Sequence, residues 1–438
     1  MEGLIMAVQL IMGISLLVVL HEFGHFIAAR AFGIKVEKFY LFFDAWGIKL
    51  FSFKKGDTEY GIGWLPLGGY VKIAGMIDES MDKEALKQPP KEWEFRSKPA
   101  WQRLIVMIGG VVMNLIVGVI IFIFINLHYT KDYIPTQEVN KTGIYAFETG
   151  RQFGFQTGDK ILAVNGKEIK RLQDALSIDV LFGATITVER NGQKVNIQIP
   201  DTAYRLFKNK RPLIIGPFNY KFKVDSVLPG TNAEKAGIQK GDMFIKVNNE
   251  NINSFGQFTE VLSKNSGKEI TAYLLRNNDT LSLKAQVDST GKLGFIPSAY
   301  KYNTAEYTFS EAVKYGTKEA FNTIIVNAKG LAKIFQGKEK ASDSLQGPIG
   351  MAKIYGGTWG DWYRFWKITG LISMILAVMN ILPIPALDGG HVIFLIIEAV
   401  TGKKFSDKFM ENAQIVGMII LLSLMVFATG NDIYKLFK

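Results

Sequence analysis

The stretch His21-Glu22-Phe23-Gly24-His25 lies near the end of an apolar run that begins at Leu4. Residues four apart share one face of a helix, so His21 and His25 can both reach one metal ion. Glu22 is then the acid/base candidate, placed to take a proton from an attacking water. The pattern H-E-x-x-H also arises by chance on soluble helices. Ionisable groups inside a segment long enough to span a bilayer are costly, however, and indicate function.

Composition favours membrane helices combined with soluble domains. The chain has 438 residues, of which 48% are apolar, and its net charge is +11. It contains no cysteine, so histidine and carboxylate side chains must hold any metal. The lysines are spread along the chain without a compact basic run, which argues against a nucleic-acid partner and favours contact with anionic lipid.

Residues 1–30 are expected to form the first membrane helix. No Lys or Arg precedes the apolar run, whereas Arg30, Lys35 and Lys38 follow it. The positive-inside rule therefore places the end of this helix in the cytoplasm, and a metal held by the motif would lie toward that side of the membrane.

Residues 31–102 combine a glycine-rich, strand-like part with a charged cytoplasmic loop. The strand-like part contains Gly68 and Gly69 and is too apolar for an ordinary loop, so we expect a β-hairpin or ribbon that dips into the membrane. A second membrane helix follows at 103–129 and carries Asn114. This side chain either makes a structural hydrogen bond between helices or lies near the metal and helps to position substrate or an oxyanion.

A repeat fills residues 130–300. The sequence from Gly154 to Gly166 aligns with the sequence from Gly237 to Asn249, an offset of 83 residues. We predict two small domains, at 130–215 and 216–300. The second copy resembles the PDZ domains of bacterial envelope proteases, which bind peptide termini by strand addition. The first copy departs from that pattern at Arg151-Gln152-Phe153, and the alternative is that both act as steric or packing modules.

The remaining chain is predicted to return to the membrane. Residues 301–364 are expected to form an amphipathic helix on the outer membrane surface and a linker, residues 365–400 a proline-broken third membrane segment, and residues 401–438 a short loop and a fourth membrane helix. Asp388 is a lone carboxylate in this apolar setting, and its natural use is as a third zinc ligand that leaves one position for water. The alternatives are that Asp388 caps a helix, or that His391 binds metal instead of supporting the site.

Together these motifs resemble the site-2 protease family, and within it the branch that regulates the sigma-E envelope stress response. The resemblance rests on the first histidine motif, on Gly347-Pro348-Ile349-Gly350, on the Gly-Gly-Tyr-Val-Lys-Ile stretch at 68–73 and on the Leu-Asp-Gly-Gly stretch at 387–390. It implies Zn²⁺ held by His21, His25 and Asp388, with Glu22 as acid/base. The residues expected to position substrate are Asn114, Asn380, Pro383, Pro385, Gly68 and Gly69.

The fold class implied is an α-helical polytopic membrane protein with four membrane helices, a membrane-associated β-ribbon and two inserted PDZ-like domains. The family implies an inner-membrane enzyme whose PDZ-like pair lies in the periplasm. Its substrates are single-span membrane proteins such as trimmed anti-sigma factors or leftover signal peptides. Two other readings remain open at this point, a catalytically dead membrane scaffold and a metal-ion transporter.

Overall fold

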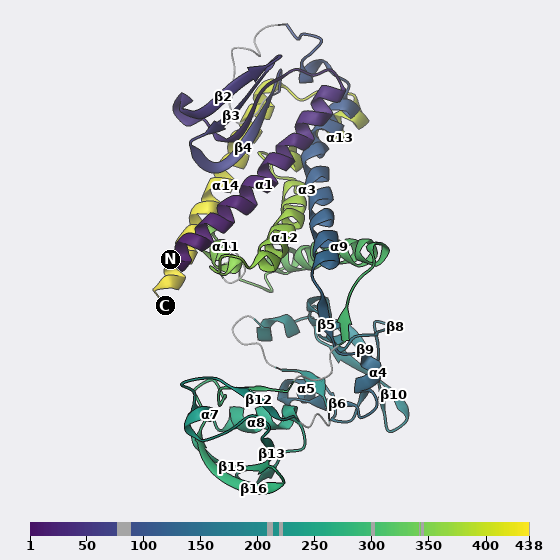
Figure 1. Cartoon of the computed structure of the whole chain (residues 1–438). Helices are drawn as coiled ribbons and strands as arrows, with labels where there is room; N and C mark the ends of the chain where they lie inside the picture. Colours follow the sequence, from purple (N-terminus) through teal and green to yellow (C-terminus); the bar gives the residue numbers. More distant parts are fainter. Residues whose placement is uncertain are drawn as a thin grey trace. The chain divides into compact units, whose positions relative to one another are not determined.

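The computed structural model describes residues 1–76, 89–207, 213–218, 222–298, 303–340, 342 and 346–437. The chain forms two compact units (Figure 1). One, the helical unit, combines Met1–Tyr129 with Tyr307–Lys438, and the other, the inserted unit, is Thr130–Glu306. Residues 77–88 of the predicted cytoplasmic loop lie outside the described residues.

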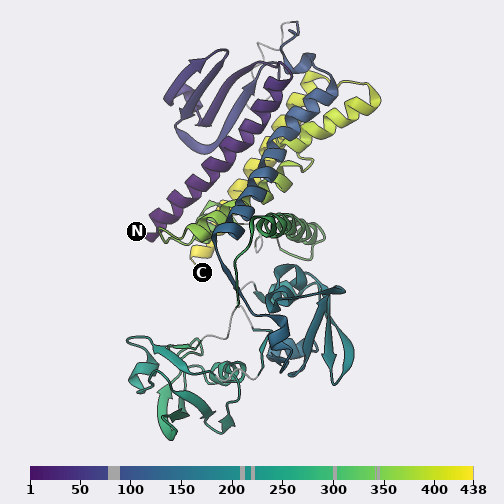
Figure 2. The same cartoon turned by 45° about the vertical axis from the view of Figure 1, so that its right-hand side comes forward.

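Long apolar helices build the helical unit. Helix α1 lies beside α3 in both views (Figures 1 and 2), and glycine permits the contact, since a Cβ on Gly24 would lie 2.2 Å from the Gly109 carbonyl oxygen. Its helices are α1 (Glu2–Ala31), α3 (Ala100–His128), α9 (Phe309–Phe335), α11 (Pro348–Tyr355), α12 (Trp362–Asn380), α13 (Asp388–Thr401) and α14 (Asp407–Leu436).

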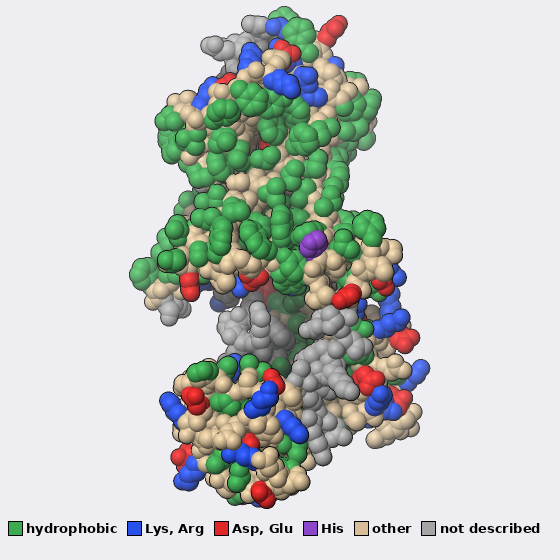
Figure 3. Space-filling model, in the orientation of Figure 1, with side chains coloured by type: hydrophobic (Ala, Val, Ile, Leu, Met, Phe, Trp, Pro, Cys, Tyr) green, Lys and Arg blue, Asp and Glu red, His purple; other side chains and the backbone are tan. Residues whose placement is uncertain are grey.

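Three helices among the described residues are long and apolar enough to cross a membrane, namely Glu2–Ala31, Ala100–His128 and Lys408–Leu436. Hydrophobic side chains cover the visible face of the helical unit, and Lys and Arg gather at the end that carries the β-sheet (Figure 3). The predicted third membrane segment is two helices, α12 and α13, joined by a turn at 381–387 that contains Pro383 and Pro385. Proline cannot donate the helical hydrogen bond, so the helix stops here, and a fourth crossing stays a prediction.

The predicted ribbon is a four-stranded sheet in the order β2-β3-β1-β4. Strand β1 pairs in parallel with β3 and antiparallel with β4, so more than a hairpin forms. At one edge, the apolar side chains of Leu50, Phe51 and Phe53 are at least half exposed. Strand β4 is at the other edge of the sheet and also contacts α1. The strands are β1 (Val36–Phe43), β2 (Lys49–Lys55), β3 (Thr58–Gly63) and β4 (Leu65–Ile73).

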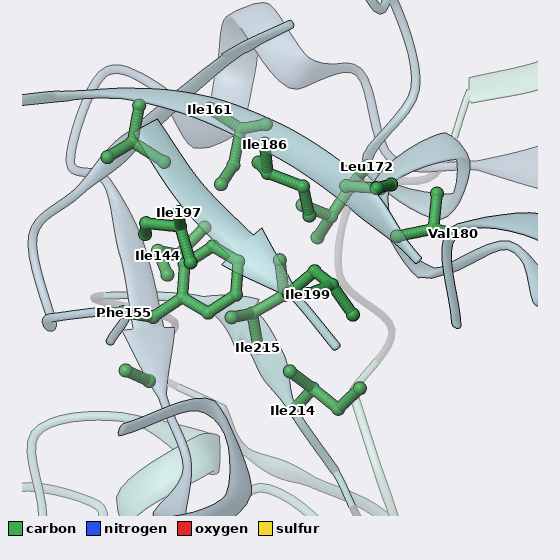
Figure 4. Packing of buried hydrophobic residues seen from close by; sticks show 14 of the residues in the cluster. Ile144, Phe155, Ile161, Leu172, Val180, Ile186, Ile197, Ile199, Ile214 and Ile215 are labelled. Atoms are coloured by element: carbon green, nitrogen blue, oxygen red, sulfur yellow. The ribbon is translucent and has the colours of Figure 1, made fainter. Parts of the chain in front are cut away.

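The inserted unit contains two four-stranded sheets of the same topology. Their orders, β10-β9-β7-β8 and β14-β13-β15-β16, match when one is read in reverse. Each sheet packs against its own apolar core. Figure 4 shows the isoleucine-rich core of the first repeat. The first sheet has β7 (Lys160–Val164), β8 (Lys167–Glu168), β9 (Ala184–Arg190) and β10 (Gln193–Ile199). The second has β13 (Met243–Val247), β14 (Glu250–Asn251), β15 (Glu269–Arg276) and β16 (Asp279–Gln286).

The described residues of the inserted unit also form three two-stranded pairs. Strand β5 pairs with β18, so the chain enters and leaves the unit through neighbouring strands. The pairs are β5 (Lys131–Tyr133) with β18 (Asn303–Ala305), β6 (Ile144–Ala146) with β11 (Ile215–Pro217), and β12 (Val224–Val227) with β17 (Phe295–Pro297). The short helices are α4 (Thr136–Val139), α5 (Glu148–Gln152), α6 (Ile178–Leu181), α7 (Asn232–Lys235) and α8 (Phe255–Lys264).

The two repeats meet at Glu260 on α8. Its carboxylate accepts hydrogen bonds from Tyr145 Oη at 2.7 Å and from Arg151 Nη2 at 2.6 Å, and both donors belong to the first repeat. Burial and this carboxylate raise the pKa of Tyr145 to about 12. The departure of the first repeat from the PDZ-like pattern at Arg151 therefore has a structural counterpart, a contact between the repeats.

Candidate metal centre

Helix α1 presents both histidines of the motif on one face. The two rings meet edge to face, with centroids 4.9 Å apart. His25 is buried, and its Nδ1 lies 2.8 Å from the Val106 carbonyl oxygen on α3. Because a carbonyl only accepts, Nδ1 carries the proton, and the Nε2 lone pair is left to face the other ligand candidates.

The turn at 381–387 brings Asp388 to the same point. Its Oδ2 lies 3.3 Å from His21 Nε2 and 3.5 Å from His25 Nε2, and the two Nε2 atoms are 3.3 Å apart. Four tetrahedral ligands at about 2.05 Å from a zinc ion would be about 3.3 Å from one another. The three separations therefore suit three corners of a tetrahedral zinc site.

The chemistry of these donors also fits a metal. Asp388 Oδ2 is buried and has no hydrogen-bond donor among the described residues. A buried carboxylate oxygen without a donor is costly, and a shared cation would satisfy it together with the two imidazoles. Leu387 and not Asp388 occupies the N-cap position of α13, the position from which an aspartate side chain usually caps a helix.

A cavity of about 590 Å³ opens beside these ligand candidates. Glu22 lines it together with all three, and strand β4 forms part of its wall. Gly68 and Gly69 lie in that wall. Glycine is required at Gly69, where a Cβ would lie 2.6 Å from the Tyr40 carbonyl oxygen and 2.8 Å from Val18. The arrangement places an acid/base group, three metal ligands and a strand edge around one space.

The two asparagines predicted to position substrate both lie against His21. Asn380 Nδ2 is 3.3 Å from His21 Nε2, and Asn380 lines the cavity. Asn114 Nδ2 is 3.1 Å from His21 Nδ1, and Asn114 is 1% exposed and is not among the cavity-lining residues. Pro383 and Pro385 do not line the cavity either. They belong to the turn that delivers Asp388.

His391 and Gln414 are two further residues of the cavity wall. His391 lines the cavity but is outside the ligand cluster of the described residues, which comprises His21, His25 and Asp388. Gln414 on α14 is 6% exposed, lines the cavity and was missed.

Comparison with known proteins gives full-length similarity. A family model described as Peptidase family M50 matches residues 9–424. A regulator of sigma E protease from Haemophilus influenzae is 30% identical over 452 aligned residues, which cover 97% of this chain and 98% of the relative. Regulator of sigma-E protease RseP from Escherichia coli is 29% identical with the same coverage. A relative from Neisseria meningitidis whose name describes it as a "putative zinc metalloprotease" is 27% identical, again over 97% of this chain and 98% of the relative.

Proposed function

Because the chain belongs to peptidase family M50 and is a zinc metalloprotease, we propose that it hydrolyses peptide bonds of single-span membrane proteins at the site described above. In this proposal His21, His25 and Asp388 hold the zinc and Glu22 is the catalytic acid/base. Membership in a peptidase family argues against the two alternatives, a catalytically dead membrane scaffold and a metal-ion transporter. The observation that carries the proposal is the convergence of three ligand atoms, 3.3–3.5 Å apart, beside Glu22 in one cavity among apolar helices.

The chemistry divides between the metal and the chain. A bound zinc supplies a Lewis acid that polarises the scissile carbonyl and acidifies water. Glu22 accepts the proton of the attacking water and passes it to the leaving amine. The amide of Asn380, which lies 3.3 Å from His21 Nε2, is proposed to donate a hydrogen bond to the scissile carbonyl oxygen. The apolar helices around the cavity limit the entry of bulk water.

A helical substrate must be opened before it can be cut, because its peptide bonds are shielded by its own hydrogen bonds. Strand β4 ends the order β2-β3-β1-β4, so one of its edges has no partner among the described strands. Residues of that strand between Leu65 and Ile73 line the same cavity as the ligand candidates. We propose that the substrate adds to β4 as an extended strand, which satisfies its backbone groups where no water is available.

The names of the relatives support a role in regulating sigma-E. We propose a trimmed anti-sigma factor and leftover signal peptides as the substrate class. We propose an inner-membrane protein with the metal toward the cytoplasm and the inserted unit in the periplasm. Arg30 in the last turn of α1, and Lys35 and Lys38 after it, support this orientation. The two repeats of the inserted unit are proposed to be PDZ-like domains that screen substrates by size or bind a peptide terminus.

The test is cleavage of a defined membrane substrate. The full chain, purified and loaded with zinc, is mixed in lipid nanodiscs with a single-span helix that carries short flanks. We expect one or more cuts inside the span, loss of cutting after chelation, and recovery when zinc is returned. A zinc-loaded protein that leaves a panel of such helices intact would overturn the proposal.

A further inference from the structure

One stripe of α3 contacts both histidines of the metal centre. Val106, Gly110 and Asn114 are spaced four residues apart, so they share one helix face. Val106 supplies the carbonyl 2.8 Å from His25 Nδ1, and Asn114 lies 3.1 Å from His21 Nδ1. Between them a side chain has no room.

At Gly110, the middle residue of this stripe, the rings of His21 and His25 pack closely against α3. A Cβ on Gly110 would lie 2.4 Å from His25 Nε2 and 2.5 Å from His21 Cε1. The glycine thus lets α3 approach until its flanking groups reach the Nδ1 atoms. Each histidine has its Nδ1 on α3 and its Nε2 toward Asp388.

The side-chain amide of Asn114, as the structure orients it, makes a contact with His21 that conflicts with metal binding by His21 Nε2. Nδ2 of Asn114 faces Nδ1, and an amide N–H can only donate. Nδ1 would then need its lone pair for that bond, so the ring proton would sit on Nε2, the atom 3.3 Å from Asp388 Oδ2. That tautomer cannot bind a metal through Nε2. Meanwhile Asn114 Oδ1 is buried and has no donor among the described residues.

A half-turn of the amide removes the tautomer conflict and gives Oδ1 a donor, and the oxygen and nitrogen of asparagine are assigned from their surroundings. Oδ1 then accepts the Nδ1 proton of His21, and the Nε2 lone pair is free. We propose that Asn114 is a positioning residue of the metal centre, whose amide oxygen fixes the tautomer and orientation of His21 as the Val106 carbonyl does for His25. The inference rests on the proposed role of His21 as a zinc ligand, and it differs from substrate positioning because Asn114 does not line the cavity.

Zinc affinity of the full chain tests this proposal without reference to catalysis. A chromophoric chelator competes with the purified protein in nanodiscs. Asn114→Leu removes the acceptor at similar volume, and we expect affinity to fall about 10- to 100-fold. Asn114→Asp keeps an oxygen acceptor and removes the donor, so we expect affinity at or above that of the unchanged protein. If donation by Nδ2 were the useful contact, Asn114→Asp would be as weak as Asn114→Leu, and the proposal would be wrong.

A matched control addresses packing at the same position. Ser373 on α12 donates from Oγ to the Asn114 backbone carbonyl at 2.8 Å, so Ser373→Ala disturbs Asn114 without touching its amide. We expect this variant to bind zinc normally. A loss as large as that of Asn114→Leu would indicate a packing effect and would overturn the inference.

The two proposals fail in different ways. A protein that binds zinc, loses affinity in Asn114→Leu and keeps it in Asn114→Asp, but cleaves no membrane helix, supports the inference and contradicts the proposed function. A protein that cleaves while Asn114→Leu binds zinc unchanged contradicts the inference alone.

Discussion

The helical unit and the inserted unit differ in how far apart in the sequence their interacting elements lie. In the helical unit the candidate metal centre needs α1, α3 and α13 at one point, and apart from the contact between His21 and His25 its contacts join residues far apart in sequence. In the inserted unit each repeat closes its own core and repeats the same internal contacts. A single substitution at the site in the helical unit should therefore abolish activity. A substitution in the inserted unit should destabilise only the repeat that carries it.

The inserted unit shows its modularity in a duplicated ion pair. Asp159 is 1% exposed and binds Arg190, and Asp242 is fully buried and binds Arg276. In both repeats the arginine also donates to the carbonyl of a glycine, Gly154 or Gly237, at 2.8 Å. The Gly-Asp turns that disclosed the repeat in the sequence are thus each held by an arginine from a later strand.

The largest effect is expected from Glu22→Gln in the helical unit. The amide cannot accept a proton, so cleavage should fall by a factor on the order of 10³ or more. The three ligand candidates are untouched, and zinc content should stay at that of the unchanged protein. Metal analysis and cleavage of a single-span substrate measure the two quantities. Substantial cleavage by this variant would remove Glu22 from the assigned role.

The next effect concerns the choice of the third ligand. Asp388→Asn replaces a carboxylate by a poorer neutral ligand, so zinc affinity and activity should fall together, affinity by roughly 100-fold. His391→Asn is the matched variant in the same cavity wall, and we expect a smaller loss with zinc retained. The opposite result, metal lost from the His391 variant and kept in the Asp388 variant, would reassign the ligand.

Removal of the repeats should change selectivity and spare the chemistry. Strands β5 and β18 pair at the entrance of the inserted unit, so deleting residues 137–296 and bridging the gap leaves both chain ends in register. A short substrate should be cut at about the normal rate, because the proposed catalytic groups lie at 21–25 and 388. An untrimmed substrate with a bulky outer domain should change from resistant to cleaved.

Both substrates are compared with both proteins in the same membranes. A truncated protein that is folded and zinc-loaded but still rejects the untrimmed substrate would contradict control of access by size. Peptide binding by the second repeat would then be the better hypothesis. In that repeat Glu260 on α8 is engaged by Tyr145 and Arg151, which shows that the neighbouring repeat contacts this helix.

The sequence predicts well those features that depend on neighbouring residues. The histidine motif, the apolar helices and the repeat offset are local patterns, and the structure has α1, α3 and α14 as long apolar helices and two sheets of matching topology. The four-stranded sheet was underestimated because the parallel pairing of β1 with β3 depends on a chain crossover that no local pattern shows. The third membrane segment was predicted to be broken by its prolines, and the structure has two helices there, but the close approach of the turn to α14 at Gly417 could not be predicted from the sequence.

The candidate site shows the same limit. Asp388 could be singled out as a lone carboxylate, yet its distance to the histidines is set by packing among three helices. Asn114 was expected either to position substrate or to make a structural hydrogen bond. Its contact with His21 Nδ1, which only the structure shows, is the basis for the proposed role in orienting a metal ligand. Gln414 was missed because nothing in its surroundings along the chain shows that it faces the cavity.

The smallest effects should come from the duplicated ion pair, and they test whether the repeats are independent. In the first repeat Arg190 Nε and Nη2 bind the two Asp159 oxygens at 2.8 Å, and the Gln156 amide donates to the same carboxylate. Asp159→Asn removes the charge from this bidentate pair, and we expect a loss of about 1.5–3 kcal/mol in the stability of that repeat.

Asp242→Asn should produce the same loss in the second repeat, where Arg276 binds Asp242 at 2.7 and 2.8 Å. Hydrogen exchange of the full chain locates each effect, because amides of one repeat should exchange faster while those of the other do not. Asp225→Asn is the control, since Asp225 is exposed and its ion pair with Lys240 spans 3.5 Å, so its effect should stay within about 0.5 kcal/mol. If either buried substitution accelerated exchange equally in both repeats, the contact at Glu260 would join them into one cooperative unit. The modular description of the inserted unit would then be wrong, and its contrast with the helical unit would disappear.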